Sequence, residues 1–307
     1  MSTSSNPPAS PSGVVAFGPP FDSIDADVIF RTSDGVDFRL HKTVLSLASP
    51  LLRDMFTAPR SAPSTTLPVV DVTEHSSVLE TALKFFYPGT HTAVSSPIEL
   101  LDILNILVQK YDMQYILPSA RAYLEKYVSD QPLAVYVVAY TYQWKELATT
   151  AAKQTLKLPL RAVSELAPAE LNHLPAAAYH NLLRYHYLCA SAAKFAVRNL
   201  TWVPVPVDLV WFTCTDCEAA LLQFFLADKE PYEMRGWFYN YMEKISSLLM
   251  ETPSLDITSH RSMQDALKEA SGCEICCEKV FEQFPSWIDD ALNPRILRAI
   301  ENVKLTI

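Results

Sequence analysis

The residues best suited to chemistry in this chain are two pairs of cysteines in its C-terminal third. Cys214 and Cys217 form the first pair, Cys273 and Cys276 the second, and each pair has the spacing Cys-x-x-Cys. That spacing places two sulfur atoms on one side of a turn, so two such pairs can complete a tetrahedral four-cysteine zinc site. Because four thiolates leave no open position for water, a zinc ion bound here would have a structural role.

Other interpretations of the cysteines stay open. The pairs are further apart than the roughly 15–20 residues of a zinc ribbon, so the chain between them would belong to a zinc-stabilised subdomain at about residues 202–280. Cys277 can replace Cys276 as a ligand, and four free thiols in a reducing compartment are the simpler alternative. Redox chemistry of the thioredoxin type is disfavoured, since it needs the pair at a helix start within a βαβ unit and neither pair has that context.

No arrangement of residues indicates catalysis. His41 is a possible base by residue type, but neither a Gly-x-Ser-x-Gly motif nor a Cys-His arrangement accompanies it. His180 and His186 do not have the i, i+4 spacing of a two-histidine metal face. With six glycines in the chain, there is little material for a phosphate-binding loop. We therefore expect no enzymatic activity and no required cofactor, and a structural zinc ion at the cysteine pairs is the one candidate.

Composition narrows the class of protein. The chain has 307 residues, of which 49% are hydrophobic and 19% charged, which suits one large or two ordinary globular domains. A net charge of -9 without basic runs argues against nucleic-acid binding. Apolar runs are too short to span a membrane, and residues 1–20, rich in Ser and Pro, predict a disordered tail rather than a secretory signal. We expect a protein of the cytosol or nucleus.

The best-defined stretch is residues 25–56. Residues 28–30 are apolar and β-rich, Asp34-Gly35 supplies a tight turn, and apolar residues then alternate with polar ones from Val36 to Leu40, which predicts a hairpin. From His41 the period becomes helical, with a break at Ser49-Pro50 that indicates the cap and first turn of a second helix.

Three blocks in this stretch resemble the opening of a BTB/POZ domain. They are Asp27-Val28, Phe38-Arg39-Leu40-His41-Lys42, and Ser49-Pro50-Leu51-Leu52-Arg53-Asp54-Met55-Phe56. The lead-in Pro20-Phe21-Asp22 is similar to that of the large fungal sets of BTB proteins. Phe85-Phe86-Tyr87-Pro88-Gly89 and Lys110-Tyr111-Asp112-Met113 resemble later blocks of the family, so the resemblance covers residues 22–130.

The predicted fold class is therefore an α+β BTB/POZ domain, a small sheet covered by helices, at residues 22–130. A mainly helical C-terminal domain follows at residues 131–307. Ser96-Pro97 predicts another helix start in the first domain. Residues 202–211 contain two prolines among β-branched residues and cannot form a regular helix, whereas Trp237-Phe238-Tyr239-Tyr241 predicts a helix that packs the core. Helices are predicted at residues 133–144, 147–156, 176–197, 218–226, 232–249 and 262–270, and another begins at Pro294.

The resemblance implies a non-enzymatic protein-protein interaction module, a scaffold or regulator that forms homo- or hetero-oligomers. One alternative is a substrate adaptor of a cullin-based ubiquitin ligase, but residues 57–66 lack the acidic residue that often marks cullin binding. A second alternative is a zinc-stabilised transcriptional regulator. No helical pattern precedes Phe21, so the N-terminal helix that many BTB dimers exchange is not expected. The candidate residues for a partner-binding groove are Asp27, His41, Lys42, Met55 and Phe56.

Overall fold

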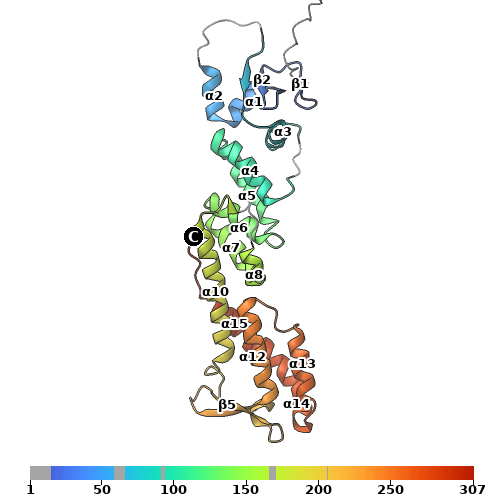
Figure 1. The fold of residues 1–307 in the computed structure, drawn as a ribbon, viewed down its shortest axis with the longest axis vertical. Coiled ribbons are helices and arrows are strands. Elements are labelled where there is room, and N and C mark those ends of the chain that lie inside the picture. Colours follow the sequence, from blue (N-terminus) through green and yellow to red (C-terminus); the bar gives the residue numbers. More distant parts are fainter. Residues whose placement is uncertain (1–14, 59–65, 91–93, 166–170, 206) are drawn as a thin grey trace, which may run out of the picture. The chain divides into compact units, whose positions relative to one another are not determined.

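The computed structural model describes residues 15–58, 66–90, 94–165, 171–205 and 207–307. Its chain divides into two compact units, Met1–Lys126 and Tyr127–Ile307 (Figure 1). Residues 1–14 of the predicted tail and most of the loop at residues 57–66 lie outside the described residues. Among the helices that are described, none is both long enough and apolar enough to cross a membrane.

The first unit is built on a four-stranded sheet in the order β1-β3-β2-β4. The predicted hairpin is present, with β2 (Val28–Arg31) antiparallel to β3 (Val36–Leu40) and Phe30 opposite Phe38. Gly35 has φ +79°, which a residue without a Cβ adopts at no steric cost. β4 (Val69–Asp71) adds a parallel strand beside β2.

The start of the sheet differs from the sequence-based expectation. The composition of residues 15–20 predicts part of a disordered tail, but Val15–Ala16 forms β1, a strand parallel to β3. The segment is fixed by packing, since the Phe17 ring stacks on Phe38 with centroids 4.3 Å apart. Phe21 is fully buried and contacts the edge of Tyr87. The lead-in is therefore part of the domain core.

Short helices cover this sheet, and serines cap two of them as predicted. The Ser49 hydroxyl accepts a hydrogen bond from the N–H of Leu52, and Ser96 does the same for Glu99, each just before a proline in the first turn. The helices are α1 (Lys42–Ala48), α2 (Pro50–Thr57), α3 (Ser76–Lys84), α4 (Pro97–Leu104) with its continuation η1 (Asn105–Lys110), η2 (Gln114–Ile116) and α5 (Leu117–Glu125).

Residues 110–113, which connect η1 to η2, contact α2 and the segment before α3. The Ser49 hydroxyl donates to the carbonyl of Tyr111 at 2.5 Å, and Met113 is buried. Lys110 Nζ contacts both carboxylate oxygens of Glu74 at 2.5 and 2.7 Å, although the Glu74 side chain is only 6% exposed. A buried carboxylate is costly unless a positive charge is paired with it. Lys110 therefore stabilises the fold by pairing with Glu74.

The second unit is mainly helical, as predicted. The long helix α10 (Ala176–Arg198) lies against both α12 (Gly236–Glu251) and α15 (Asn293–Glu301). Its other helices are α6 (Pro132–Thr141), α7 (Lys145–Thr155), α8 (Leu160–Ser164), α11 (Val210–Thr213), α13 (Arg261–Ala270), α14 (Glu274–Trp287) and η3 (Ile288–Leu292).

Two predicted helices of this unit are wrong in whole or in part. Residues 218–226 form the strand β5 (Ala219–Phe225), which pairs antiparallel with β6 (Pro231–Arg235). The helix predicted at residues 232–249 therefore begins only at Gly236. Helix-forming residues fill β5, but the pairing with β6 overrides this local propensity.

Aromatic side chains form the core beside this hairpin. Trp211 and Phe238 are fully buried and stack with ring centroids 4.9 Å apart. Trp237, Phe284 and Trp287 meet them edge-on. The predicted core role of the aromatic run at residues 237–241 is thus confirmed for Trp237, Phe238 and Tyr241, which are buried. The same cluster joins α11, α12 and α14.

Candidate metal centre and partner-binding surface

The two Cys-x-x-Cys pairs come together at one end of the second unit. Cys214 follows the last turn of α11, and Cys217 lies just before β5. Cys273 is the residue that precedes α14, and Cys276 lies in the first turn of that helix. The sulfur atoms all lie within 4.8 Å of one another, with 3.6 Å between Cys214 and Cys273 and 3.5 Å between Cys217 and Cys276.

This arrangement fits a tetrahedral zinc ion. Zn–S bonds of about 2.3 Å place the sulfurs of a regular tetrahedron roughly 3.8 Å apart, close to the shorter separations found here. Cys214 and Cys276 are buried, Cys217 and Cys273 are half-buried, and Cys277 is exposed. The structure therefore brings Cys276 rather than Cys277 into the group of four, which could hold a metal ion.

The thiols of the cluster differ in how readily they ionise. Burial opposes ionisation of Cys214, but backbone N–H groups of Cys217 and Asp216 and the neighbouring thiols favour its thiolate and lower its pKa to about 7. Burial raises the pKa of Cys276 to about 11 and also raises that of Cys217. Four thiolates this close repel one another, so a bound dication would be needed to hold all of them ionised.

The surrounding elements fix the first pair of cysteines in place. Arg235, at the end of β6, donates a hydrogen bond from Nη1 to the carbonyl of Cys217 at 3.1 Å. The N–H of Gly236 donates to the carbonyl of Glu218 at 2.9 Å. The half-buried Cys217 and Cys273 line a surface hollow of about 410 Å³, so one edge of the cluster faces solvent. Cys189 lies apart, buried in α10, and burial raises its pKa to about 11.

In the first unit, three of the candidate groove residues hold the junction between β3 and α1. Asp27 accepts a hydrogen bond from the N–H of Lys42 at 2.7 Å, at the start of α1. The backbone N–H of His41 donates to the Tyr87 hydroxyl, whose oxygen also lies 2.5 Å from His41 Nδ1. His41 Nε2 is 3.2 Å from Asp25. These contacts give the side chains of Asp27 and His41 a role in the fold, whereas Lys42 takes part through its backbone N–H alone.

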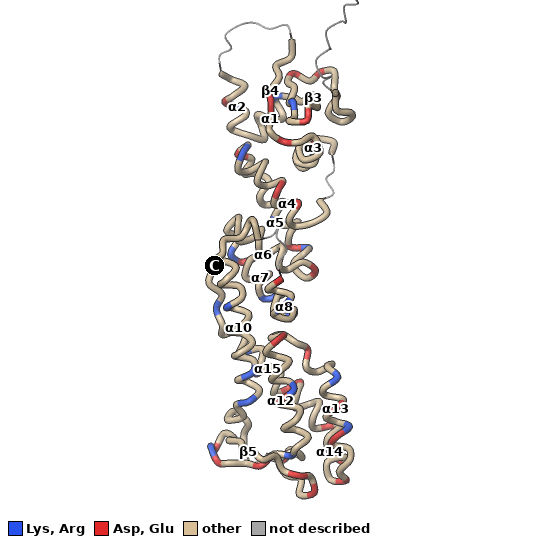
Figure 2. The backbone as a smooth tube through the Cα atoms, viewed as in Figure 1, with Lys and Arg blue, Asp and Glu red and all other residues tan. Residues whose placement is uncertain are grey.

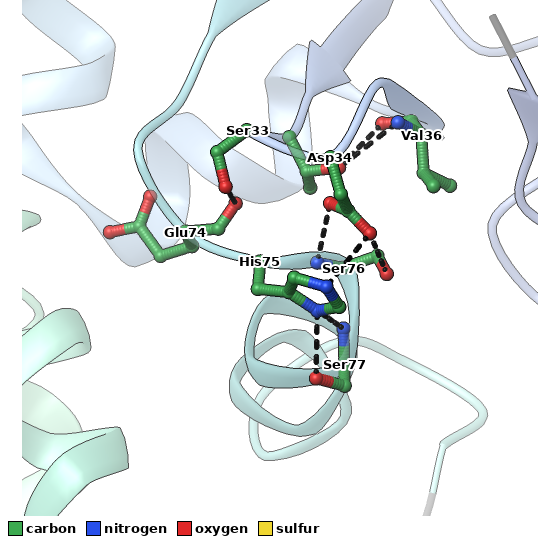
Figure 3. Close-up of polar contacts among 8 residues, drawn as sticks. Ser33, Asp34, Val36, Glu74, His75, Ser76 and Ser77 are labelled. Carbon is green, nitrogen blue, oxygen red and sulfur yellow. Dashed lines mark hydrogen bonds and ion pairs between the residues drawn. The ribbon is translucent and has the colours of Figure 1, made fainter.

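A second polar network ties the hairpin turn to α3 (Figure 3). Asp34 accepts hydrogen bonds from the hydroxyl of Ser76 at 2.7 Å and from its N–H at 3.0 Å. His75, which caps α3, lies 3.3 Å from the same carboxylate. The Ser76 hydroxyl, followed by that of Thr32, holds the pKa of Asp34 well below its usual range. Asp34 is thus ionised throughout the physiological pH range.

Three exposed apolar side chains of the first unit lie on α1 and α2. Leu47, Leu51 and Met55 are 76%, 52% and 41% exposed, and Phe56 beside them is half-buried. Next to Leu47 is a groove of about 240 Å³. It is lined by Val44, Leu47, Ala48, Phe86, Pro88 and Tyr115.

Comparison with known families agrees with this architecture. The family model of the BTB/POZ domain matches residues 20–127. This part of the chain is a BTB/POZ domain. No curated protein matches the chain. BTB domains are protein-interaction domains rather than catalytic ones, and they also mediate oligomerisation.

The BTB domain presents apolar residues that the sequence analysis did not select. Met55 lies on the exposed apolar face, whereas the groove beside that face contains none of the five candidates. A signal was present in the sequence, because each of the two helices has more apolar residues than the core takes. Leu45 of α1 and Leu52 of α2 are buried, whereas Leu47 of α1 and Leu51 and Met55 of α2 remain exposed.

Proposed function

We propose that this chain is a non-enzymatic protein-interaction module in which the BTB domain serves as a scaffold or regulator and binds its partner through the apolar face of α1 and α2. The observation that carries the proposal is the exposure of Leu47, Leu51 and Met55 beside a groove. A contiguous exposed apolar patch is characteristic of interaction sites. Because aliphatic and aromatic side chains line the groove, we expect the partner to insert an apolar side chain into it.

The groove gives this surface its specificity. Tyr115 lines the groove and is 54% exposed, so its side chain is accessible to a partner. Arg53 and Asp54 are exposed on the same helix as Leu51 and Met55 and provide charges near the apolar residues. An apolar centre with polar residues around it is the usual composition of a protein-protein interface.

The surface can be tested with Leu47→Asp in the full chain. Affinity purification with mass spectrometry should recover a set of partners with the wild type that the variant loses. Val78→Asp is the matched control, because Val78 is also exposed, on α3 of the same domain. Retention of every partner by Leu47→Asp, or equal loss with Val78→Asp, would contradict the proposal.

The same experiment separates the scaffold from the adaptor. Recovery of cullin and ring-type ligase subunits that depends on Leu47 favours the ubiquitin-ligase adaptor. Other partners without ligase subunits favour the scaffold. The transcriptional regulator is the weakest candidate, since residues 202–292 carry sixteen Asp and Glu against six Lys and Arg, the wrong charge for a DNA-binding surface.

A structural zinc ion at the four-cysteine cluster is part of the same proposal. Four thiolates would occupy the whole coordination sphere, so the ion would cross-link α11 and β5 to α14 rather than activate water. We place the protein in the cytosol or nucleus, where the reducing environment keeps close thiols such as these available to a metal.

A further inference from the structure

Positive charge gathers on one pair of helices in an otherwise acidic chain. The helix α10 and residues 293–307 together carry six Lys and Arg and one acidic residue, Glu301, whereas the whole chain has a net charge of -9. Figure 2 shows blue segments along α10 and red segments along α13 and α14. A local charge opposite to that of the whole protein attracts partners that the rest of the surface repels.

A hollow of about 130 Å³ lies where α10 packs against α15. Its lining includes Phe195 and Asn199 from the end of α10, and Arg295, Arg298, Ala299 and Asn302 from α15 and its C-cap. The last three of these follow Arg295 by three, four and seven residues, which places all four on one face of the helix. Both arginines therefore belong to the wall of one hollow.

The polar groups of this hollow are mainly hydrogen-bond donors. A guanidinium group donates and cannot accept. The Asn199 side chain already uses its oxygen, which accepts hydrogen bonds from the N–H and the hydroxyl of Thr201 at 3.1 and 2.7 Å, so its NH2 group is the part left for a ligand. No carboxylate is among the residues that line the hollow, and Glu301 is not one of them. Such a lining suits the oxygen atoms of an anion.

The two arginines are not neutralised by their neighbours. Arg198, on α10, is paired with Glu243. Arg295 and Arg298 are exposed, and neither forms an ion pair with any residue that the structure describes. A guanidinium group binds a carboxylate through two parallel hydrogen bonds. The hollow thus offers two unused groups of the kind that recognise carboxylates.

Size and apolar lining indicate what kind of anion fits. Sites for cofactors and other small molecules occupy about 300–1,000 Å³, so a hollow of about 130 Å³ suits a single side chain. Phe195 is 65% exposed at its wall and can pack against a second, apolar side chain. Aromatic residues and arginine are also the types enriched in protein-protein interfaces. The ligand that matches these features is part of another protein.

We propose that the hollow between α10 and α15 binds an acidic segment of a partner protein. A Glu or Asp side chain of that segment binds Arg295 and Arg298, and a neighbouring apolar side chain packs on Phe195. Further acidic residues of the segment are attracted by Arg184 and Lys194 along α10. This site lies in the second unit and does not depend on the apolar face of the BTB domain, so either proposal can fail without the other.

A phage-displayed library of random heptapeptides supplies a defined probe for the purified full chain. Phage that bind the Arg295→Gln, Arg298→Gln chain are removed first, which eliminates binders of other surfaces. The peptides enriched on the wild type should share an Asp or Glu beside an apolar residue. The most enriched peptide is then synthesised, and its Kd is measured by fluorescence anisotropy.

Variants of the hollow give tests that the selection does not build in. Ala299→Leu fills the hollow but keeps both arginines, and should raise the Kd at least tenfold. Phe195→Ala should raise it at least threefold, as should Gln in place of the acidic residues of the peptide. Lys153→Gln with Lys157→Gln removes two charges at exposed positions near the end of α7 and should leave the Kd unchanged.

Thermal unfolding checks that each variant is folded, and Phe195→Ala remains a test if Ala299→Leu is not. Failure to enrich acidic peptides would overturn the proposal. So would a peptide that binds both hollow variants as tightly as the wild type, since its binding would then reflect surface charge alone. Competition by inorganic phosphate at concentrations near the Kd of the peptide would also overturn it, because the hollow would then be a site for a free anion.

Discussion

Replacement of Cys276 by serine tests the metal centre most directly. The Cys276 side chain is fully buried, and its sulfur lies 3.5 Å from that of Cys217. Serine keeps the size of the side chain but does not supply a thiolate, so the cluster falls to three ligands. We expect zinc bound at one equivalent per wild-type chain and at well under half an equivalent in Cys276→Ser.

The loss of stability can be worked from the separation of the cysteines. Cys217 and Cys276 are 59 residues apart, and a cross-link that closes a loop of this size removes unfolded-state entropy worth about 4 kcal/mol. The second unit, Tyr127–Ile307, is in the size class for which 1 kcal/mol shifts Tm by about 2–4 °C. Loss of the cross-link should therefore lower the Tm of this unit by about 8–16 °C.

The assay combines elemental analysis of the purified chain with thermal unfolding, before and after treatment with a zinc chelator. Cys277→Ser is the matched control, because Cys277 is the next residue but is exposed outside the cluster. The control should keep its zinc and its Tm, and the chelator should lower the Tm of the wild type but not of Cys276→Ser. Metal content below half an equivalent in the wild type, or equal Tm values for Cys276→Ser and the wild type, would refute the reasoning.

Three further predictions concern the two units. Asp34→Asn should destabilise the BTB domain at pH 7, because the folded state lowers the pKa of Asp34 and so favours its carboxylate. The difference in unfolding free energy between wild type and variant should narrow as pH falls below about 4, where the carboxyl of the unfolded chain protonates. A difference that grows at low pH would contradict this. Lys110→Met leaves the buried Glu74 carboxylate without its charged partner, with only the Tyr111 hydroxyl still donating to it. The variant should cost about 1–3 kcal/mol in urea unfolding, but much less in a Glu74→Leu background. Phe238→Ala removes a fully buried ring and should cost about 3–5 kcal/mol, whereas Phe281→Ala at the surface should change the unfolding free energy of the monomer by under about 0.5 kcal/mol.

Local signals in the sequence predicted much of the BTB domain. The Asp34-Gly35 turn and the serine-proline helix starts depend on only a few neighbouring residues, and each is present as predicted. The strand at Val15–Ala16 depends instead on pairing with β3, about twenty residues away. Two residues carry no periodic pattern, so residues 1–20 alone could not distinguish this strand from a tail.

The second unit shows the same limit. Ala219–Phe225 contains alanine, leucine and glutamine, which favour helix. The segment forms a strand because it pairs with β6. The start of α14 was not predicted, because Cys-Glu-Ile-Cys was interpreted as a turn and not as the entry to a helix. Spacing did select the four cysteines of the cluster, but which sulfurs are neighbours depends on α12 and α13 between them.

The position of the cysteines also has a consequence during synthesis. Each cysteine of the first pair leaves the ribosome 59 residues before its neighbour in the cluster, which at 5–20 residues per second is an interval of about 3–12 s. If the cluster binds zinc as we propose, Cys214 and Cys217 have only half of their ligands through that interval, so they would hold a metal weakly and their thiols would stay open to oxidants. We then expect the yield of native chains to depend on the supply of zinc and of reducing equivalents during translation.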